Sequence, residues 1–182
     1  THVIHGMNGE QIRTAWTNTF KQITGAAMAL FAGVALVQLM LNSHVNAGGL
    51  DSMMTAMAKA AAGIAGNSFP FFAPLIGVLG AFVSGSNTVS NILFASFQFE
   101  TAAILNMPEV LIVALQVIGG AAGNMICVNN VVAACATVGA MGVEGKLIRR
   151  NFFPCIFYCV VVAIVLGALI YSGFNPFPLT RV

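Results

Sequence analysis

Charged side chains are scarce in this sequence of 182 residues, at 7% of the total, whereas soluble domains carry about 25%. No Asp, Glu, Lys or Arg lies between Lys59 and Glu100, or between Glu109 and Glu144. Hydrophobic residues make up 58% of the chain, and the mean hydropathy is +0.91. This balance excludes a soluble globular protein and predicts an all-α, polytopic transmembrane helical bundle in a lipid bilayer. The net charge of +2 is too small to indicate a nucleic-acid partner.

Patterns for metal, redox or hydrolytic chemistry are also missing. The four cysteines lie in apolar stretches without a Cys-x-x-Cys pair, so we interpret them as small packing residues: Cys127, Cys135, Cys155 and Cys159. His2 and His5 are spaced as H-x-x-H, but two ligands in a polar terminus are a weak metal signal. There is no Gly-x-Ser-x-Gly elbow and no Walker lysine, and the apolar stretches hold no carboxylate pair. We therefore expect no enzyme, no metal and no cofactor.

Apolar runs and polar interruptions divide the chain into segments of different expected depth in the membrane. The runs 23–41 and 152–171 are each close to the roughly 20 residues that a transmembrane helix needs. The run 52–65 is shorter and carries Lys59, which favours a helix that lies in the interface. The expected order is a polar or interfacial segment at 1–22, then a transmembrane domain at 23–182 made of a span (23–41), an interfacial helix (52–65), a re-entrant hairpin (69–99), a broken helix (108–142), an aqueous loop (142–151) and a last span (152–171).

The hairpin is predicted from a polar stretch, 85–91, inside the charge-free region. The apolar arms on its two sides, 69–83 and 92–99, are each shorter than a full span. Within lipid, a break in a helix frees backbone groups that must be buried in protein or line a wet cavity. The sequence therefore predicts a helix that enters the membrane, a polar tip near mid-depth, and a helix that returns to the same side.

Two kinds of ligand suit such a tip. Hydroxyl and amide oxygens together with freed carbonyls can coordinate a hard cation, whereas the N-terminus of the returning half-helix favours a carboxylate. The candidate binding residues at the tip are Gly85, Ser86, Asn87, Thr88, Ser90 and Asn91.

A second interruption lies in the apolar run 110–143, which is longer than a straight span. Its Gly119-Gly120-Ala121-Ala122-Gly123-Asn124 stretch suits either close helix packing or an unwound break of the kind found in transporter helices, and we expect the break. The asparagines in and after this break are candidate ligands opposite the tip: Asn124, Asn129 and Asn130.

Basic residues predict the orientation in the membrane. The cluster Lys146, Arg149 and Arg150, together with Arg13 and Lys21, favours the cytoplasmic side. Both groups lie on that side only if 52–65 does not span and the hairpin returns to the side from which it entered.

The same polar motifs resemble a known family. The stretch Gly85–Asn91 with the following Phe94–Phe99, and the run Gln116–Cys127, resemble the C-terminal part of the bacterial L-lactate permease family. The Ser86-Asn87-Thr88 triplet is also similar to the hairpin-tip motif of divalent-anion/sodium symporters of the ion transporter superfamily. The resemblance implies that this chain is the C-terminal portion of a multi-pass carrier in the bacterial inner membrane, in contact with the remainder of the full-length permease.

What the family implies is symport of L-lactate, and often of D-lactate and glycolate, with a proton. An anion channel, another carboxylate/sodium symporter and a non-transporting scaffold remain as alternatives, and the oligomeric state is not indicated.

Proton coupling needs a group that changes charge, and no histidine lies in an expected span. Glu100 is the best candidate, since partial desolvation at the end of the hairpin would favour its protonated form. The alternative is a solvated residue at a loop boundary. Glu109 is a weaker candidate, because beside Pro108 it suits the first turn of a helix.

Overall fold

The computed structural model describes residues 6–176, and in that part of the chain every regular element is a helix. The elements are α1 (Gly9–Asn42), α2 (Met53–Ala65), a short 3-10 turn η1 (Gly66–Ser68), α3 (Phe69–Ser84), α4 (Asn87–Ile104), α5 (Glu109–Gly123), α6 (Val128–Thr137) and α7 (Glu144–Tyr171). The predicted all-α class is confirmed. His2 and His5 lie outside the described residues.

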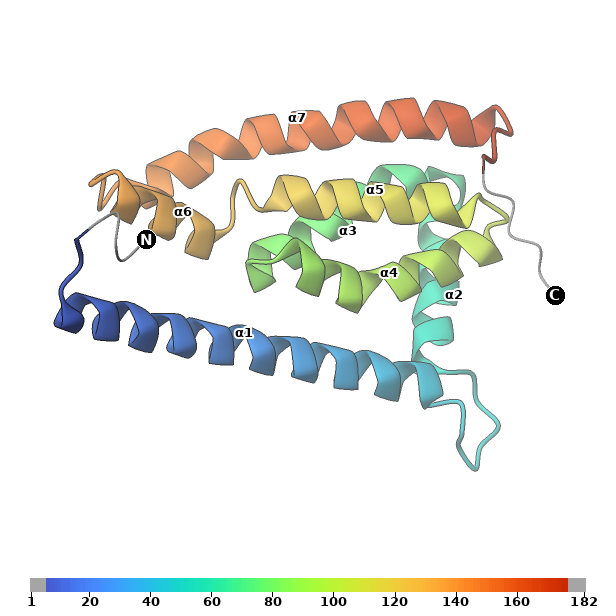
Figure 1. Cartoon of the computed structure of the whole chain (residues 1–182). Helices are drawn as coiled ribbons and strands as arrows, with labels where there is room; N and C mark the ends of the chain where they lie inside the picture. The colour runs from blue at the N-terminus through green and yellow to red at the C-terminus, as the bar shows by residue number, and fades with distance from the viewer. Residues whose placement is uncertain (1–5, 177–182) are drawn as a thin grey trace.

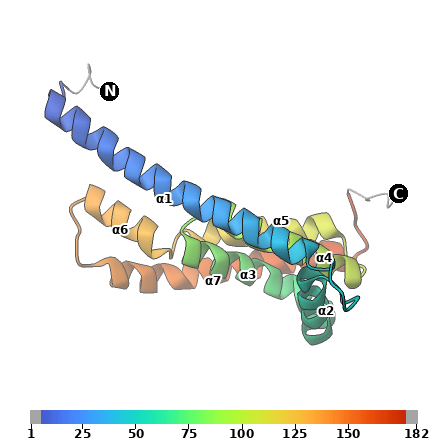
Figure 2. The ribbon, with the colours of Figure 1, turned by 90° about the horizontal axis from the view of Figure 1, so that it is seen from below.

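The three helices α3, α4 and α5 form the centre of the molecule, between α1 on one side and α7 on the other (Figure 1). The most extensive contact is between α3 and α5, whereas α1 contacts α4 and α2 far less extensively. The N-terminal half of α1 diverges from the other helices (Figure 2). α2 runs across the direction of the other helices (Figure 1). The buried hydrophobic residues form one cluster between α3, α4, α5 and α7, a second between α3, α5 and α7, and a third between α1, α2 and α4.

Length and apolar character make three stretches suited to cross a membrane: 9–42, 53–84 and 144–171. The pair α5 and α6 becomes a fourth if the two are one span, which bends by 41° at the break between them. The second stretch includes α2 as well as α3, and the chain turns at Gly66, which has a φ of +47°.

The expected boundary between 1–22 and 23–41 is wrong as a structural boundary, since α1 runs unbroken through it for 34 residues. The helix starts at a capping box, in which the side chains of Asn8 and Gln11 each accept a hydrogen bond from the other's backbone N–H. Its polar residues do not end it, because Thr17 and Thr24 donate to the carbonyl oxygens four residues earlier, at 2.9 and 2.8 Å. The change in polarity at residue 22 marks a change of environment along one helix.

Two further expected ends differ from the structure. The segment 142–151 is largely helical, because α7 begins at Glu144, whose negative charge suits a first helical turn. Lysine and arginine are good helix formers. The charges of this segment therefore indicate that it is exposed to water, but they do not interrupt the helix. The returning arm of the hairpin ends at Ile104 instead of residue 99, which places Glu100 inside α4.

A break in the backbone lies at or near each predicted position, but the expected unwinding at 119–124 is wrong for the glycines. Gly119–Gly123 stay within α5 and serve the alternative use, close packing against another helix, so the break begins only at Asn124. α3 and α4 are antiparallel neighbours joined at 85–86, and α5 is separated from α6 by residues 124–127. The 16 residues of α3 extend about 24 Å, less than the roughly 30 Å of a hydrocarbon core. The turn between α3 and α4 accordingly lies part-way along α1 and α7 in Figure 1.

Glycines allow the backbones of α3 and α5 to touch. A Cβ atom on Gly119 would overlap the carbonyl oxygen of Pro74, and one on Gly123 would lie 2.6 Å from the carbonyl oxygen of Val78. From the other helix, a Cβ on Gly77 would lie 2.7 Å from the backbone nitrogen of Gly120. Small residues let helices approach to this degree in a membrane, where lipid offers no hydrophobic drive for association. Here backbone meets backbone, so no side chain can move aside to relieve a clash.

We expect Gly119→Ala to destabilise the protein by about 1–3 kcal/mol, because the added methyl group must push α3 and α5 apart. Gly63→Ala in α2 is the matched control, since a Cβ there meets no atom within 4 Å and alanine favours a helix. Thermal unfolding in detergent should show a lower Tm for the first variant and an unchanged or higher Tm for the second. Equal Tm values for both variants would contradict the tight packing of α3 on α5.

Candidate functional site

The tip of the hairpin is held in shape by its own polar residues. Gly85 has a φ of +74°, which suits glycine, and its N–H caps α3 by donating to the carbonyl of Ala81 at 2.8 Å. Ser86 caps the start of α4, because its hydroxyl accepts from the N–H of Val89 at 3.4 Å. The hydroxyl of Ser84 lies 3.0 Å from the carbonyl oxygen of Ser86. The tip therefore ends one helix and starts the next within two residues.

The second break lies directly against this tip. A Cβ on Gly85 would lie 3.3 Å from both Cys127 Sγ and Asn129 Nδ2. Cys127 is the residue before the first turn of α6, and no side chain caps that helix. The N-termini of α4 and α6 thus come together at one place, and each presents the positive end of a helix dipole.

The asparagines after the second break are placed unequally. Asn129 lies beside the tip, as predicted, and is exposed on its other sides. Asn130 donates to Asn124 Oδ1 at 3.2 Å, so these two side chains bind each other across the break. The structure thus brings Asn129 to Gly85, while Asn124 and Asn130 stabilise the bend.

The tip residues face different ways. Asn87 is half-buried, and its Oδ1 packs against the Cα of Gly120, where a Cβ would overlap it. Ser90 is fully buried, and its hydroxyl donates to the carbonyl of Gly77 at 2.9 Å. Asn91 Nδ2 donates to Asn87 Oδ1 at 3.2 Å, whereas Thr88 is exposed. Ser90 and Asn91 therefore attach the first turns of α4 to its neighbours, whereas the side chains of Asn87 and Thr88 remain accessible at the tip.

Two glutamines that were not predicted as site residues extend this network inward. Gln98 on α4 and Gln116 on α5 are both fully buried, and Gln98 Nε2 donates to Gln116 Oε1 at 2.6 Å. Gln116 Nε2 in turn lies 3.0 Å from Ser90 Oγ and 3.3 Å from Asn91 Oδ1. The sequence does hold a signal for them, because a glutamine in a charge-free helix must find partners within the protein.

One buried atom of the network lacks a partner. Gln98 Oε1 makes no hydrogen bond within the described residues. The two hydrogen bonds of this amide, to the Ala73 carbonyl and to Gln116 Oε1, are both made by its nitrogen. An unsatisfied buried acceptor costs about 1–3 kcal/mol, which is a large penalty for a residue with only a packing role.

Glu100 is distant from the tip. It lies 13 residues after Asn87 on α4, about 20 Å along the helix axis. Its carboxylate accepts a hydrogen bond from Thr55 Oγ1 of α2 at 3.2 Å. Beside it is an open groove of about 390 Å³ between α1, α4 and α5, lined by Leu41, Ala95, Ser96, Phe99, Glu100 and Val113.

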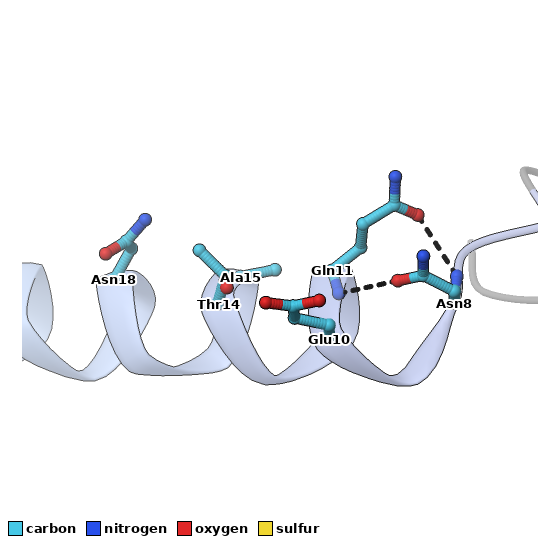
Figure 3. A pocket seen from close by; sticks show the side chains of 6 residues that line it. All are labelled: Asn8, Glu10, Gln11, Thr14, Ala15 and Asn18. Atoms are coloured by element: carbon cyan, nitrogen blue, oxygen red, sulfur yellow. Dashed lines mark hydrogen bonds between the residues drawn. The ribbon is translucent and has the colours of Figure 1, made fainter.

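Other hollows do not gather polar groups from several helices. The one in Figure 3, of about 560 Å³, is lined by the first turns of α1 and by Asn8, and its two hydrogen bonds are those of the capping box. A groove of about 400 Å³ between α3 and α7 is almost entirely apolar, lined by Leu75, Val78, Leu79, Phe82, Ile126, Ile148, Phe152 and Ile156. Within residues 6–176, no three His, Cys, Asp or Glu side chains are grouped to hold a metal. The meeting point of the two helix breaks is thus the candidate site.

Comparison with known proteins identifies the family of this chain. The family model described as L-lactate permease matches residues 1–172. This chain belongs to the L-lactate permease family. The family is one of membrane transporters, so the chain is a membrane protein of a permease family, and its apolar helices fit that setting.

Named relatives share part of their length with this member of the family. The putative L-lactate permease of Haemophilus influenzae is 35% identical over 163 residues, 90% of this chain and 29% of that protein. Glycolate permease GlcA of Escherichia coli is 39% identical over 125 residues, 68% of this chain and 22% of that protein. The L-lactate permease of Bacillus subtilis is 39% identical over 102 residues, 56% of this chain and 18% of that protein. The chain thus spans less than a third of the length of these relatives, and no solved structure matches it.

Proposed function

We propose that this chain is the C-terminal part of a secondary carrier that moves small monocarboxylates, L-lactate together with D-lactate and glycolate, across the bacterial inner membrane. The observation that carries the proposal is the meeting of two helix N-termini, those of α4 and α6, around uncharged polar side chains. Backbone N–H groups and the positive dipole ends at such a place favour a carboxylate. The names of the relatives, L-lactate and glycolate permease, agree with a small hydroxylated monocarboxylate as the substrate.

The proposed membrane arrangement follows from helix lengths. α3 is too short to cross by itself, and α2 does not extend it because α2 runs across the direction of the other helices (Figure 1). In the proposed arrangement α3 and α4 form a re-entrant hairpin whose tip lies near mid-depth, opposite the break between α5 and α6. Broken helices at this depth suit a transporter, because irregular backbone in a membrane must line a cavity or be buried in protein. In this arrangement α2 lies at the membrane surface, and both basic clusters face the cytoplasm.

Coupling to a proton is part of the same proposal. Glu100 is a half-buried carboxylate between α4 and α2 and lines an open groove, so it is positioned to take up and release a proton. Its distance from the tip implies that coupling acts through movement of the hairpin, without direct contact between the proton site and the substrate.

We expect Asn87→Ala and Thr88→Ala, each in the intact carrier, to reduce lactate uptake at least tenfold while the amount of carrier in the membrane stays normal. A ligand group lost at mid-depth is not replaced by bulk water. Uptake of radiolabelled L-lactate into cells or proteoliposomes gives the measurement, with the exposed Asn18→Ala on α1 as the control. Normal uptake by both tip variants would remove the tip from the site and leave a scaffold role for the hairpin.

The topology is tested by introduced cysteines, after the four buried native cysteines have been replaced. Cysteines at Asn46 and Asn106 should both react with an impermeant thiol reagent from outside the cell, and one at Gly145 should not. The hairpin model requires 46 and 106 on one side, because the chain between them enters and leaves the same face. Labelling of these two positions from opposite sides would mean an odd number of crossings and no re-entrant hairpin.

Proton coupling is tested by Glu100→Gln, which keeps the shape of the side chain and removes its titration. Accumulation driven by a pH gradient should fail, whereas exchange of lactate at equal pH should persist. Glu109→Gln, in the first turn of α5, is the matched control and should retain accumulation. Unchanged accumulation in the Glu100 variant would assign coupling to another residue of the carrier.

A further inference from the structure

We infer that Gln98, Gln116 and Asn91 form a directional amide relay that fixes Asn87 at the tip as a hydrogen-bond donor, so that the site selects an anionic oxygen over a cation. The inference rests on the proposed function, since it assigns the polarity of that same site. The three relay residues act as positioning residues, because they act through Asn87 and none is placed against the substrate. Each link is a side-chain amide, which has a donor end and an acceptor end.

The direction of the relay is set first by a backbone carbonyl of α3. Gln98 Nε2 lies 2.9 Å from the carbonyl oxygen of Ala73, which can only accept, so this amide must present its nitrogen there. The same nitrogen donates to Gln116 Oε1 at 2.6 Å. Gln116 therefore has its oxygen toward Gln98 and its nitrogen toward the tip.

A second carbonyl of α3 sets the same direction independently. The hydroxyl of Ser90 donates its single hydrogen to the carbonyl of Gly77 at 2.9 Å. Toward Gln116, Ser90 Oγ can then only accept, and it accepts from Gln116 Nε2 at 3.0 Å. Reversal of Gln116 would face its oxygen toward an acceptor on one side and its nitrogen toward a donor on the other. Both carbonyls thus require the orientation that the structure has.

The relay passes this direction to the tip. Gln116 Nε2 donates to Asn91 Oδ1 at 3.3 Å, and Asn91 Nδ2 donates to Asn87 Oδ1 at 3.2 Å. The oxygen of Asn87 is further confined by Gly120, where there is no room for a side chain. Asn87 Nδ2 makes no hydrogen bond to any described residue, so it adds a side-chain donor to the backbone N–H groups at the N-terminus of α4.

The unpaired oxygen of Gln98 fits this account. In a chain of amides that all point one way, the first oxygen receives no hydrogen bond from the chain itself, and Gln98 Oε1 is that acceptor at the buried end. The free donor lies at the opposite end, on Asn87. A cation at the tip would need the reverse arrangement, with Asn87 Oδ1 outward, and this would leave Asn91 Nδ2 facing a donor. The network therefore favours a carboxylate oxygen at the tip and opposes a bound sodium ion in the same position.

The test is a double-mutant cycle in the intact carrier. Gln116→Met and Asn91→Leu each interrupt the relay with a side chain of similar size, so that Asn87 loses its fixed orientation. Each should raise the KM for L-lactate about tenfold with little change in kcat, since pre-organised ligand groups lower the cost of binding. If both act through one relay, the double variant should have the KM of a single variant, because contacts in one network are not additive. Thr101→Val is the control, since this buried hydroxyl on α4 bonds only to the carbonyl of Phe97.

The outcomes separate the relay from the proposed function. A double variant whose KM increase is the product of the two single increases would show two independent packing defects and overturn the relay. Single variants with KM within twofold of the parent would overturn it as well, even where Asn87→Ala abolishes uptake and the tip stands as the site. If Gln116→Met fails to reach the membrane, the half-buried Asn91→Leu alone decides, by its KM. Normal transport by Asn87→Ala would overturn both the relay and the assignment of the tip.

Discussion

The contact of α3 with α5, backbone against backbone, is the constraint on which the rest of the structure depends. Gly77, Gly119 and Gly123 remove the side chains that would hold these helices apart. Carbonyls of α3 also accept hydrogen bonds from two polar side chains of α4, Ser90 and Gln98. The contact of α3 with α5 holds the end of α3 beside the end of α5, so that the two breaks come to one level. Without this contact, the N-termini of α4 and α6 would not share a site.

The chemistry at this site uses neutral groups, and that choice follows from the medium. A charged side chain at mid-depth in a bilayer is costly, whereas amides and hydroxyls that bond one another satisfy themselves within the protein. A low dielectric also strengthens each hydrogen bond in such a network. Because amides do not titrate, a site built from them keeps its polarity at every pH, so the proposed proton coupling requires a titratable group elsewhere. The separation of Glu100 from the tip agrees with that division of tasks.

The hairpin turn could be predicted from the sequence because glycine, serine and asparagine are unusual inside long apolar runs. The second break was expected at 119–124, but its glycines stay helical because they pack against the backbone of α3, and the break begins at Asn124. The extent of the helices was harder to predict. α1 continues through residue 22 and α7 begins before residue 152. Polar and basic residues can remain helical where a helix extends from an apolar environment into water. Polarity reports the environment of a residue more reliably than its backbone conformation.

Part of the site was also beyond sequence reasoning. The tip residues and Asn129 were expected to face one another, and the structure places Gly85 beside Asn129. Gln98 and Gln116 were not expected as site residues, because their roles depend on which carbonyls of α3 lie opposite them. Which carbonyls lie opposite these glutamines is decided by the packing of α3, α4 and α5 against one another, and no local sequence pattern contains this information. Likewise, the hydrogen bond between Asn124 and Asn130 could not be predicted without the geometry of the break.

The most direct test of the central claim is an experimental structure of the intact carrier with L-lactate bound, at a resolution that defines side-chain amides. The account predicts ligand density between the first turns of α4 and α6, with a carboxylate oxygen within hydrogen-bonding distance of Asn87 Nδ2. Lactate bound away from both helix breaks, or a cation held by Asn87 Oδ1 at the tip, would contradict it.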